Sequence, residues 1–258
     1  LELFANIRPV KIRKSLINSS TLKKEVIKNV DLIVVRELTG GIYFGEPRGV
    51  INIENEKRSF NTMTYGTSEI KRITDVAIKI AKKRRNVICS VDKANVLEVS
   101  QLWRDTVSEI LEKDSEITLN HMYVDNAAMQ LIKNPSQFDV ILTSNLFGDI
   151  LSDLSAMLSG SIGMLPSASI NNKGPGVYEP VHGSAPDIAG KDLANPIAMA
   201  LSTAMLFKIG LNEIRASEII ENAIDKVLLK GYRTSDLAGS TSKIISCSEM
   251  GEKIIDEI

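Results

Sequence analysis

Apolar and polar residues change their spacing in a regular way along the first part of the chain. Short runs rich in β-branched residues predict buried strands, and apolar residues three or four positions apart predict amphipathic helices. The expected strands cover residues 31–35, 87–91, 117–124 and 139–143. The expected helices cover residues 67–85, 100–113, 126–132 and 148–159. This alternation predicts an α/β fold with a largely parallel sheet and helices on both of its faces.

Two stretches depart from the alternation. Residues 42–65 are rich in Gly, Asn, aromatic and β-branched residues, which predicts a hairpin arm that projects from the sheet. Residues 160–195 are rich in Gly and Pro and predict a loop segment. That segment separates the α/β part from a helical end. The helices expected there cover residues 196–209, 216–229 and 242–258.

Composition narrows the class of protein. The 258 residues are 43% hydrophobic and 24% charged, which is ordinary for a globular chain. The net charge of −1 gives no general basic field for nucleic acid or anionic lipid. The basic run at 82–85 is expected as the solvated last turn of a helix. No apolar run has the length of a membrane span.

The two cysteines, Cys89 and Cys247, have neither the number nor the spacing of a disulfide framework or a zinc site. Their pattern favours a reducing compartment, and we expect a cytoplasmic protein.

Polar residues follow the predicted strands in otherwise apolar surroundings. They are Arg36 with Glu37, Asp92 with Lys93, Asp125, and Asn145 followed by Asp149. In open α/β sheets, ligands bind at the carboxyl ends of the strands. A strand end is also a natural helix N-cap position, and Asp125 taken alone fits that structural role.

Asp149 and Asp153 stand four positions apart on one predicted helix. This spacing places both carboxylates on one face, where like charges repel, and no cation stands at helical spacing from either. A divalent cation would turn the repulsion into binding, because hard ions prefer several oxygen ligands. Asp125 from a neighbouring strand end would supply a third carboxylate. Taken alone, the pair fits a solvated helix face equally well.

Three cations and one tyrosine are further candidates. Arg8 and Arg36 suit bidentate binding of carboxylates. Lys93 follows an apolar strand, where burial lowers the pKa of an amine and suits it to act as a base. Tyr43 lies between glycines that allow the backbone to approach a ligand closely. Taken singly, the cations also fit surface charges, and the tyrosine segment also fits a plain hairpin turn.

Residues 179–196 form a segment of small residues suited to wrapping a nucleotide. An acidic residue in such a loop accepts hydrogen bonds from both ribose hydroxyls and repels a 2′-phosphate. The chain has no G-x-G-x-x-G, so the Rossmann fingerprint is absent. His182 has no other His or Cys nearby in the sequence and is not expected to bind zinc.

Together these segments resemble the β-decarboxylating dehydrogenase family, which contains the isocitrate and isopropylmalate enzymes. The matching stretches, in family order, lie at 3–9, 36–45, 92–97, 123–125, 145–153 and 179–195. Arg-Glu-Leu-Thr-Gly-Gly, which begins at Arg36, is the isopropylmalate-type form. The resemblance implies an isopropylmalate-dehydrogenase-like α/β fold with two domains and a hairpin arm that helps to build a homodimer.

The resemblance also implies roles for the candidate residues. Arg8, Arg36 and Asp125 would bind the substrate, and Tyr43 and Lys93 would be the catalytic acid–base pair. Lys93 and Asp125 would serve the active site of the partner subunit.

The resemblance further implies two cofactors, a divalent metal and NAD. Mg²⁺ or Mn²⁺ would be bound by Asp125, Asp149 and Asp153. The residues implied in NAD binding are Glu179, His182, Gly183, Ser184, Ala185, Pro186, Asp187, Ile188 and Asn195. Among them, Asp187 would select NAD over NADP.

Family members carry a further α/β segment ahead of Leu3, with the isopropyl pocket and another carboxylate-binding arginine. We therefore expect the sequence to be N-terminally incomplete. Residues 4–159 are expected to form the central substrate, metal and dimerisation domain, with its arm at about 42–65. Residues 160–258, with 1–3, are expected to form the C-terminal part of the cofactor domain.

The expected reaction is the oxidative decarboxylation of (2R,3S)-3-isopropylmalate to 4-methyl-2-oxopentanoate with reduction of NAD⁺, a step of leucine biosynthesis. One alternative is a related enzyme for tartrate, malate, isocitrate or homoisocitrate. The other is a non-catalytic regulatory paralogue, which the retention of the three aspartates, Lys93 and Tyr43 disfavours. Neither nucleic acid nor a membrane is expected as a partner.

Overall fold

The computed structural model describes residues 1–239 and 242–258. Its strands are β1 (Ala5–Lys11), β2 (Asp31–Glu37), β3 (Gly49–Ile53), β4 (Glu56–Phe60), β5 (Val87–Asp92), β6 (Thr118–Tyr123), β7 (Val140–Thr143), β8 (Pro166–Ile170), β9 (Val177–Pro180), β10 (Tyr232–Arg233) and β11 (Lys243–Ile244). Its α-helices are α1 (Lys24–Ile27), α2 (Thr67–Ala81), α3 (Glu98–Leu111), α4 (Val124–Lys133), α5 (Asn145–Ala156), α6 (Ile197–Met205), α7 (Ile214–Leu229) and α8 (Cys247–Ile255).

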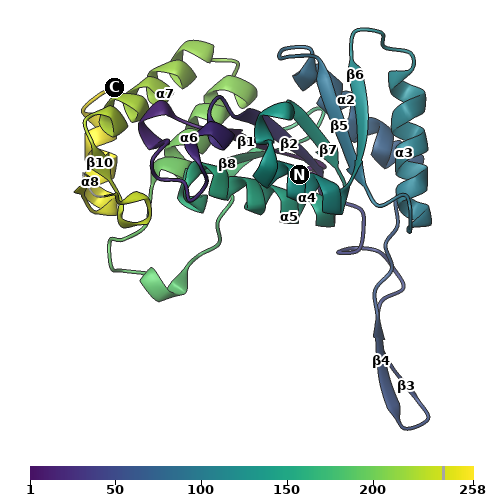
Figure 1. Cartoon of the computed structure of the whole chain (residues 1–258). Helices are drawn as coiled ribbons and strands as arrows, with labels where there is room; N and C mark the ends of the chain where they lie inside the picture. The colour runs from purple at the N-terminus through teal and green to yellow at the C-terminus, as the bar shows by residue number, and fades with distance from the viewer. Residues whose placement is uncertain (240–241) are drawn as a thin grey trace.

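A mixed sheet forms the centre of the molecule (Figure 1), with the strand order β6-β5-β7-β2-β1-β8-β9. β6, β5, β7 and β2 run parallel, whereas β1, β8 and β9 pair antiparallel with their neighbours. The expected largely parallel sheet is therefore right for one half only. Asn6 and Arg8 interrupt the apolar run of β1, and β8 and β9 are short strands inside the segment expected to be a loop.

Helices cover both faces of the sheet, as the alternation predicts. Val35 and Leu142 pack with Trp103 of α3 and with α2 in one apolar cluster. Val34 and Ile141, their neighbours in the same strands, pack with α4 and α5 in a second cluster. Successive side chains of a strand point to opposite faces, so one strand serves both layers.

The helical end has a third apolar cluster of its own, in which α6, α7 and α8 pack together. Its last helix is shorter than expected, because β11 occupies Lys243–Ile244 and pairs in parallel with β10. Helix α8 begins only after Ser246, whose hydroxyl accepts from the Glu249 N–H in a capping box. None of the helices in the described ranges combines the length and apolar character that a bilayer crossing requires.

Helix α2 ends at Ala81, and the basic run follows it as a turn. The expectation of a wholly solvated run is wrong for Arg84, which donates to Asp31 and to Asp139, both at 2.7 Å. Asp139 is fully buried and also accepts from the Arg85 N–H at 2.9 Å. Tertiary pairing thus draws part of the basic run into the protein.

Replacing Asp139 by alanine is expected to lower the free energy of unfolding by roughly 3 kcal/mol, because the change leaves a partly buried Arg84 charge without its buried partner. Urea denaturation followed by circular dichroism measures this change. Asp256→Ala is the control, since it breaks an exposed pair with Lys253 and should change stability little. Equal stability of the two variants would contradict a structural role for Asp139.

The stretch at 42–65 forms the expected arm, which projects far from the body (Figure 1). β3 and β4 pair antiparallel from Gly49↔Phe60 to Ile53↔Glu56. Every residue of both strands is exposed in the single chain. An isolated two-stranded hairpin is marginally stable in water. Such an arm is suited to packing against another surface.

Candidate active site

Two buried arginines lie side by side on β1 and β2, where Asn6 pairs with Arg36 and Arg8 with Val34. Arg36 donates through Nε and Nη2 to the Asn145 Oδ1 at 3.0 and 2.8 Å. Its Nη1 donates to the Asp149 Oδ1 at 2.5 Å. These contacts aim the guanidinium at the first turns of α5.

Gly148 makes this arrangement possible. A Cβ at this position would lie 2.7 Å from the Cγ of Arg36, closer than side-chain atoms approach one another. The absence of a side chain on α5 therefore lets Arg36 pass across the helix to Asp149.

Arg8 binds the same helix one turn further on. Its Nε donates to the Asn6 Oδ1 at 2.6 Å, and its Nη1 donates to Ser152 at 2.6 Å and to the Asp153 Oδ1 at 3.2 Å. Burial lowers the pKa of Arg8, and the positive charge of Arg36 lowers it further. Two cations held this close together in the interior favour an anionic ligand.

The two aspartates of α5 are thus paired by tertiary contacts, which the sequence pattern could not reveal. Asp149 is half-buried, and the exposed Asp153 completes the cluster. Burial raises the pKa of Asp153 against the opposing effect of Arg8, and the charge of Asp149 adds to the rise. A bound cation would relieve the repulsion between these two carboxylates.

Tyr43 joins the aspartates from the start of the arm. Its hydroxyl donates to the Asp149 Oδ2 at 3.0 Å. Burial raises the pKa of Tyr43, and the hydrogen bond to Asp149 raises it further. A tyrosine phenol is protonated at neutral pH in any case, as a proton donor requires, and the raised pKa extends the protonated state to higher pH.

Lys93 and Asp125 form a second cluster at the ends of β5 and β6, where the Lys93 Nζ lies 2.6 Å from the Asp125 Oδ1. The hydrogen bond from Lys93 lowers the pKa of Asp125. Arg104 of α3 joins the two strand ends, because it binds the buried Asp92 with two hydrogen bonds of 2.9 Å and lies 4.9 Å above the Tyr123 ring.

The single chain does not bring all three aspartates together. Within residues 1–239 and 242–258, no group of three His, Cys, Asp or Glu side chains is placed to hold a metal ion. Asp149 and Asp153 offer the hard carboxylate oxygens that Mg²⁺ and Mn²⁺ prefer. They fit such an ion if a further ligand comes from outside this chain.

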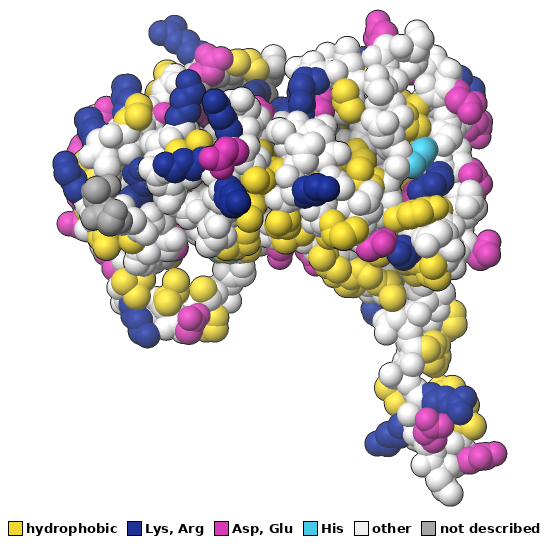
Figure 2. Space-filling view, viewed as in Figure 1, with side chains coloured by type: hydrophobic (Ala, Val, Ile, Leu, Met, Phe, Trp, Pro, Cys, Tyr) yellow, Lys and Arg dark blue, Asp and Glu magenta, His cyan; other side chains and the backbone are white. Residues whose placement is uncertain are grey.

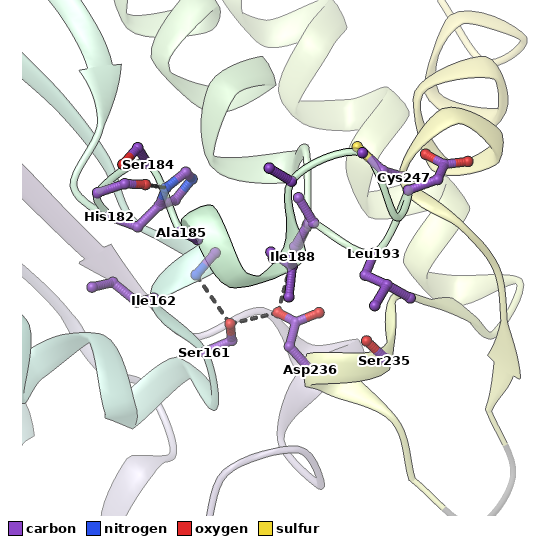
Figure 3. A pocket seen from close by; sticks show the side chains of 17 residues that line it. Ser161, Ile162, His182, Ser184, Ala185, Ile188, Leu193, Ser235, Asp236 and Cys247 are labelled. Carbon is purple, nitrogen blue, oxygen red and sulfur yellow. Dashed lines mark hydrogen bonds between the residues drawn. The ribbon is translucent and has the colours of Figure 1, made fainter.

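A pocket of about 810 Å³ lies between the loop at 182–195 and the C-terminal segment (Figure 3). This volume falls within the usual range for small-molecule sites, about 300–1,000 Å³. The predicted cofactor residues that line it are His182, Gly183, Ser184, Ala185, Ile188 and Asn195. Glu179, Pro186 and Asp187 are not among its lining residues.

Asn195 is buried, and both ends of its side-chain amide are engaged. Its Oδ1 accepts from the Ile197 N–H at 3.0 Å, and its Nδ2 donates to the Asp236 Oδ2 at 3.0 Å. The amide therefore shapes the pocket as well as lining it.

Sequence reasoning gave no role to several residues of these sites. Asn6 orients Arg8, and the two share one face of β1 because they stand two positions apart. A polar residue two positions from an arginine inside an apolar strand was the available signal. Arg104 and Asp236 carried no local signal, because their partners lie far away in the sequence.

Comparisons with known proteins bear on the whole chain. The sequence pattern of the family described as isocitrate/isopropylmalate dehydrogenase matches residues 1–254. A protein of Prochlorococcus marinus subsp. pastoris named 3-isopropylmalate dehydrogenase is 72% identical over the full chain, which spans 72% of that protein. A protein of the same name from Synechococcus sp. is 61% identical over 99% of the chain and 71% of that protein.

Among solved structures, the isocitrate dehydrogenase of Methylococcus capsulatus superposes with a TM-score of 0.90. It is 34% identical, and the match covers 98% of this chain and 73% of that one.

Proposed function

The chain belongs to the isocitrate/isopropylmalate dehydrogenase family, and from that premise we propose that it oxidises and decarboxylates (2R,3S)-3-isopropylmalate with NAD⁺ as the oxidant. The product is 4-methyl-2-oxopentanoate, in leucine biosynthesis. The observation that carries the proposal is the cluster on β1, β2 and α5, in which two buried arginines lie against two aspartates and Tyr43. The arginines of this cluster can bind a dicarboxylate substrate, and the adjacent aspartates can bind a metal ion.

In this proposal Arg8 and Arg36 bind the substrate carboxylates. Each guanidinium has five N–H donors, more than its contacts with α5 and Asn6 or Asn145 use. The hydrogen bonds to Asn6 and Asn145 hold both groups in place before the substrate arrives, which lowers the entropy cost of binding it.

Mg²⁺ or Mn²⁺ would be held by Asp149 and Asp153 together with Asp125 of the partner subunit. When bound, such an ion supplies a Lewis acid beside the hydroxyl and carboxylate of the substrate. Asp125 would also contact the substrate. Its pairing with Lys93 gives both residues a fixed place at the strand ends until the site is assembled.

Lys93 and Tyr43 divide the proton transfers. Lys93 accepts the hydroxyl proton of the substrate, directly or through one water. NAD, when bound beside the substrate, would supply the hydride acceptor. Tyr43 donates a proton to the carbon that loses CO₂.

The pocket beside residues 182–195 would hold the adenosine part of NAD. Its lining contains Asp192 and Asp236 and no Lys or Arg among the described residues, which disfavours a nucleotide with an additional 2′-phosphate. Asp187 stands in the 3-10 turn Pro186–Ile188 beside the pocket and would bind the ribose hydroxyls. Pro186, in the same turn as Asp187, and Glu179, on β9 ahead of the loop, would complete the NAD site.

We also infer a homodimer with shared active sites. Hydrophobic side chains gather along the underside of the body, over α4 and α5, and on the arm (Figure 2). Ile150 of α5 is 55% exposed, and Met157, which directly follows α5, is 46% exposed. Met129 of α4 is 61% exposed, and Val50 of the arm is 67% exposed. Exposed apolar residues on adjacent elements are typical of a protein interface. A second copy would cover them and bring Lys93 and Asp125 to its partner's aspartates.

The two proposed domains follow from this arrangement. Residues 4–159 hold the arginine–aspartate cluster, the arm and the exposed faces of α4 and α5. Residues 160–258 hold the nucleotide pocket and most of the third apolar cluster.

Isocitrate is the second candidate substrate, because the structure of an isocitrate dehydrogenase superposes closely on this chain.

The purified protein is expected to form NADH from isopropylmalate with a higher kcat/KM than from isocitrate, malate or tartrate. EDTA should abolish the reaction, and added Mg²⁺ should restore it. The absorbance of NADH measures the rate in each of these assays. A preference for isocitrate would replace the proposed substrate, and no turnover with any of the four acids would favour the regulatory paralogue.

A further inference from the structure

One carboxylate joins three separate segments at the nucleotide pocket. Asp236 stands in the 3-10 turn Ser235–Leu237, just before the last strand and helix. Its Oδ2 accepts from the Ser161 hydroxyl at 2.5 Å and from the Asn195 Nδ2 at 3.0 Å, and its Oδ1 accepts from the Thr234 hydroxyl at 2.5 Å. Figure 3 shows Asp236 beneath the loop that carries Leu193 and Ile188, with Ser161 beside it.

Two of the partners of Asp236, Ser161 and Asn195, fix the backbone around the pocket. The Ser161 Oγ accepts from the Gly163 N–H at 3.0 Å, which caps the turn Ile162–Met164. The Asn195 Oδ1 accepts from the Ile197 N–H, at the start of α6. The two capped segments also touch, since a Cβ on Gly163 would lie 2.7 Å from the Cβ of Asn195. A displacement of Asp236 would therefore shift both of the segments that Ser161 and Asn195 fix, and both segments line the pocket.

The charge of Asp236 is met by hydroxyl and amide donors. Among the described residues, no Lys or Arg pairs with Asp236, and none lines the pocket. Hydrogen bonds to a charged acceptor are about twice as strong as those between neutral groups. A carboxylate thus holds these three donors more firmly than an amide of the same shape would.

We propose that Asp236 is the positioning residue of the nucleotide pocket, through which Ser161 and Asn195 hold the adenosine-binding loop ready for its ligand. The inference rests on the proposed NAD site and adds to it a residue from outside the loop. Asp236 acts through its neighbours, so its loss should weaken nucleotide binding and leave the proton transfers unchanged.

The test measures binding of ADP-ribose, which carries the adenosine end of NAD without the nicotinamide, by isothermal titration calorimetry. Asp236→Asn is expected to raise the Kd for ADP-ribose about tenfold, because all three donors, among them Ser161 and Asn195, lose a charged acceptor. KM for NAD should rise by a similar factor, with kcat nearly unchanged. Ser161→Ala, which removes one of the donors, should shift Kd in the same direction by less. Asp256→Asn, which changes an exposed carboxylate on the last turn, should leave both constants unchanged.

Wild-type Kd values for Asp236→Asn and Ser161→Ala would overturn the inference, even if their melting temperatures fell. If Asp236→Asn does not fold, Ser161→Ala and Asp236→Glu decide the question by the same titration. Failure of the wild-type protein itself to bind ADP-ribose or NAD would instead overturn the proposed function.

Discussion

Replacing Lys93 by methionine is expected to lower kcat by about 10²- to 10⁴-fold, the usual contribution of a positioned general base. Methionine keeps most of the length of the side chain but lacks the amine that lies 2.6 Å from Asp125. The hydroxyl proton of the substrate then has no acceptor at the proposed place. KM for NAD should change little, because the pocket at 182–195 is untouched. Initial rates of NADH formation give both constants.

Lys113→Met is the matched control for this variant. Lys113 follows α3 and pairs with Glu109 on the protein surface at 3.3 Å. Its replacement removes an equal charge and should leave kcat at the wild-type value. Thermal unfolding of both variants checks that the fold is intact. Near-normal turnover by Lys93→Met would rule out lysine as the base.

The spacing of apolar residues predicts those parts of the fold that local patterns determine. These parts include β2, β5 and β7, which are strongly apolar, and the long helices between them. The strands and helices that the spacing of apolar residues predicts there are present in the structure. β1 and the β8–β9 pair escape prediction for a physical reason. Asn6 and Arg8 interrupt the apolar pattern of β1 because they serve a site. β8 pairs with β1, which lies far away in the sequence, and β9 pairs with β8 at the edge of the sheet.

The candidate site shows the same division. The end of a strand and an i, i+4 spacing identify Asp125, Asp149 and Asp153 as candidates without the coordinates. The partners of these side chains depend on tertiary contacts. Arg8 and Asp153 are in contact although they stand 145 positions apart in the sequence, and no spacing rule predicts such a contact. The resemblance implies that Asp125 serves the partner's site, whereas the spacing of residues alone does not separate it from the other two aspartates, as the structure does.

If each active site combines Asp125 of one subunit with Asp149 of the other, two inactive variants should complement each other. Asp125→Asn and Asp149→Asn should each lose nearly all activity, because each removes a charged metal ligand from every active site of the dimer. Changes to residues that only orient a metal ligand typically cost about 10- to 100-fold, and loss of a ligand should cost no less. A mixture of the two inactive variants, refolded or co-expressed together, should regain activity. In the mixed dimer one site collects both substitutions, and the other has the wild-type set.

Random mixing makes half of the dimers mixed and leaves one intact site in each, so about a quarter of the wild-type activity should return in a symmetric dimer. A mixture of Asp149→Asn with Asp153→Asn is the control, since both residues lie on α5 of the same chain and no mixed dimer has an intact site. Initial rates at saturating Mg²⁺ measure the recovery. Recovery in the control as well, or in neither mixture, would contradict active sites built from Asp125 of one subunit and Asp149 of the other.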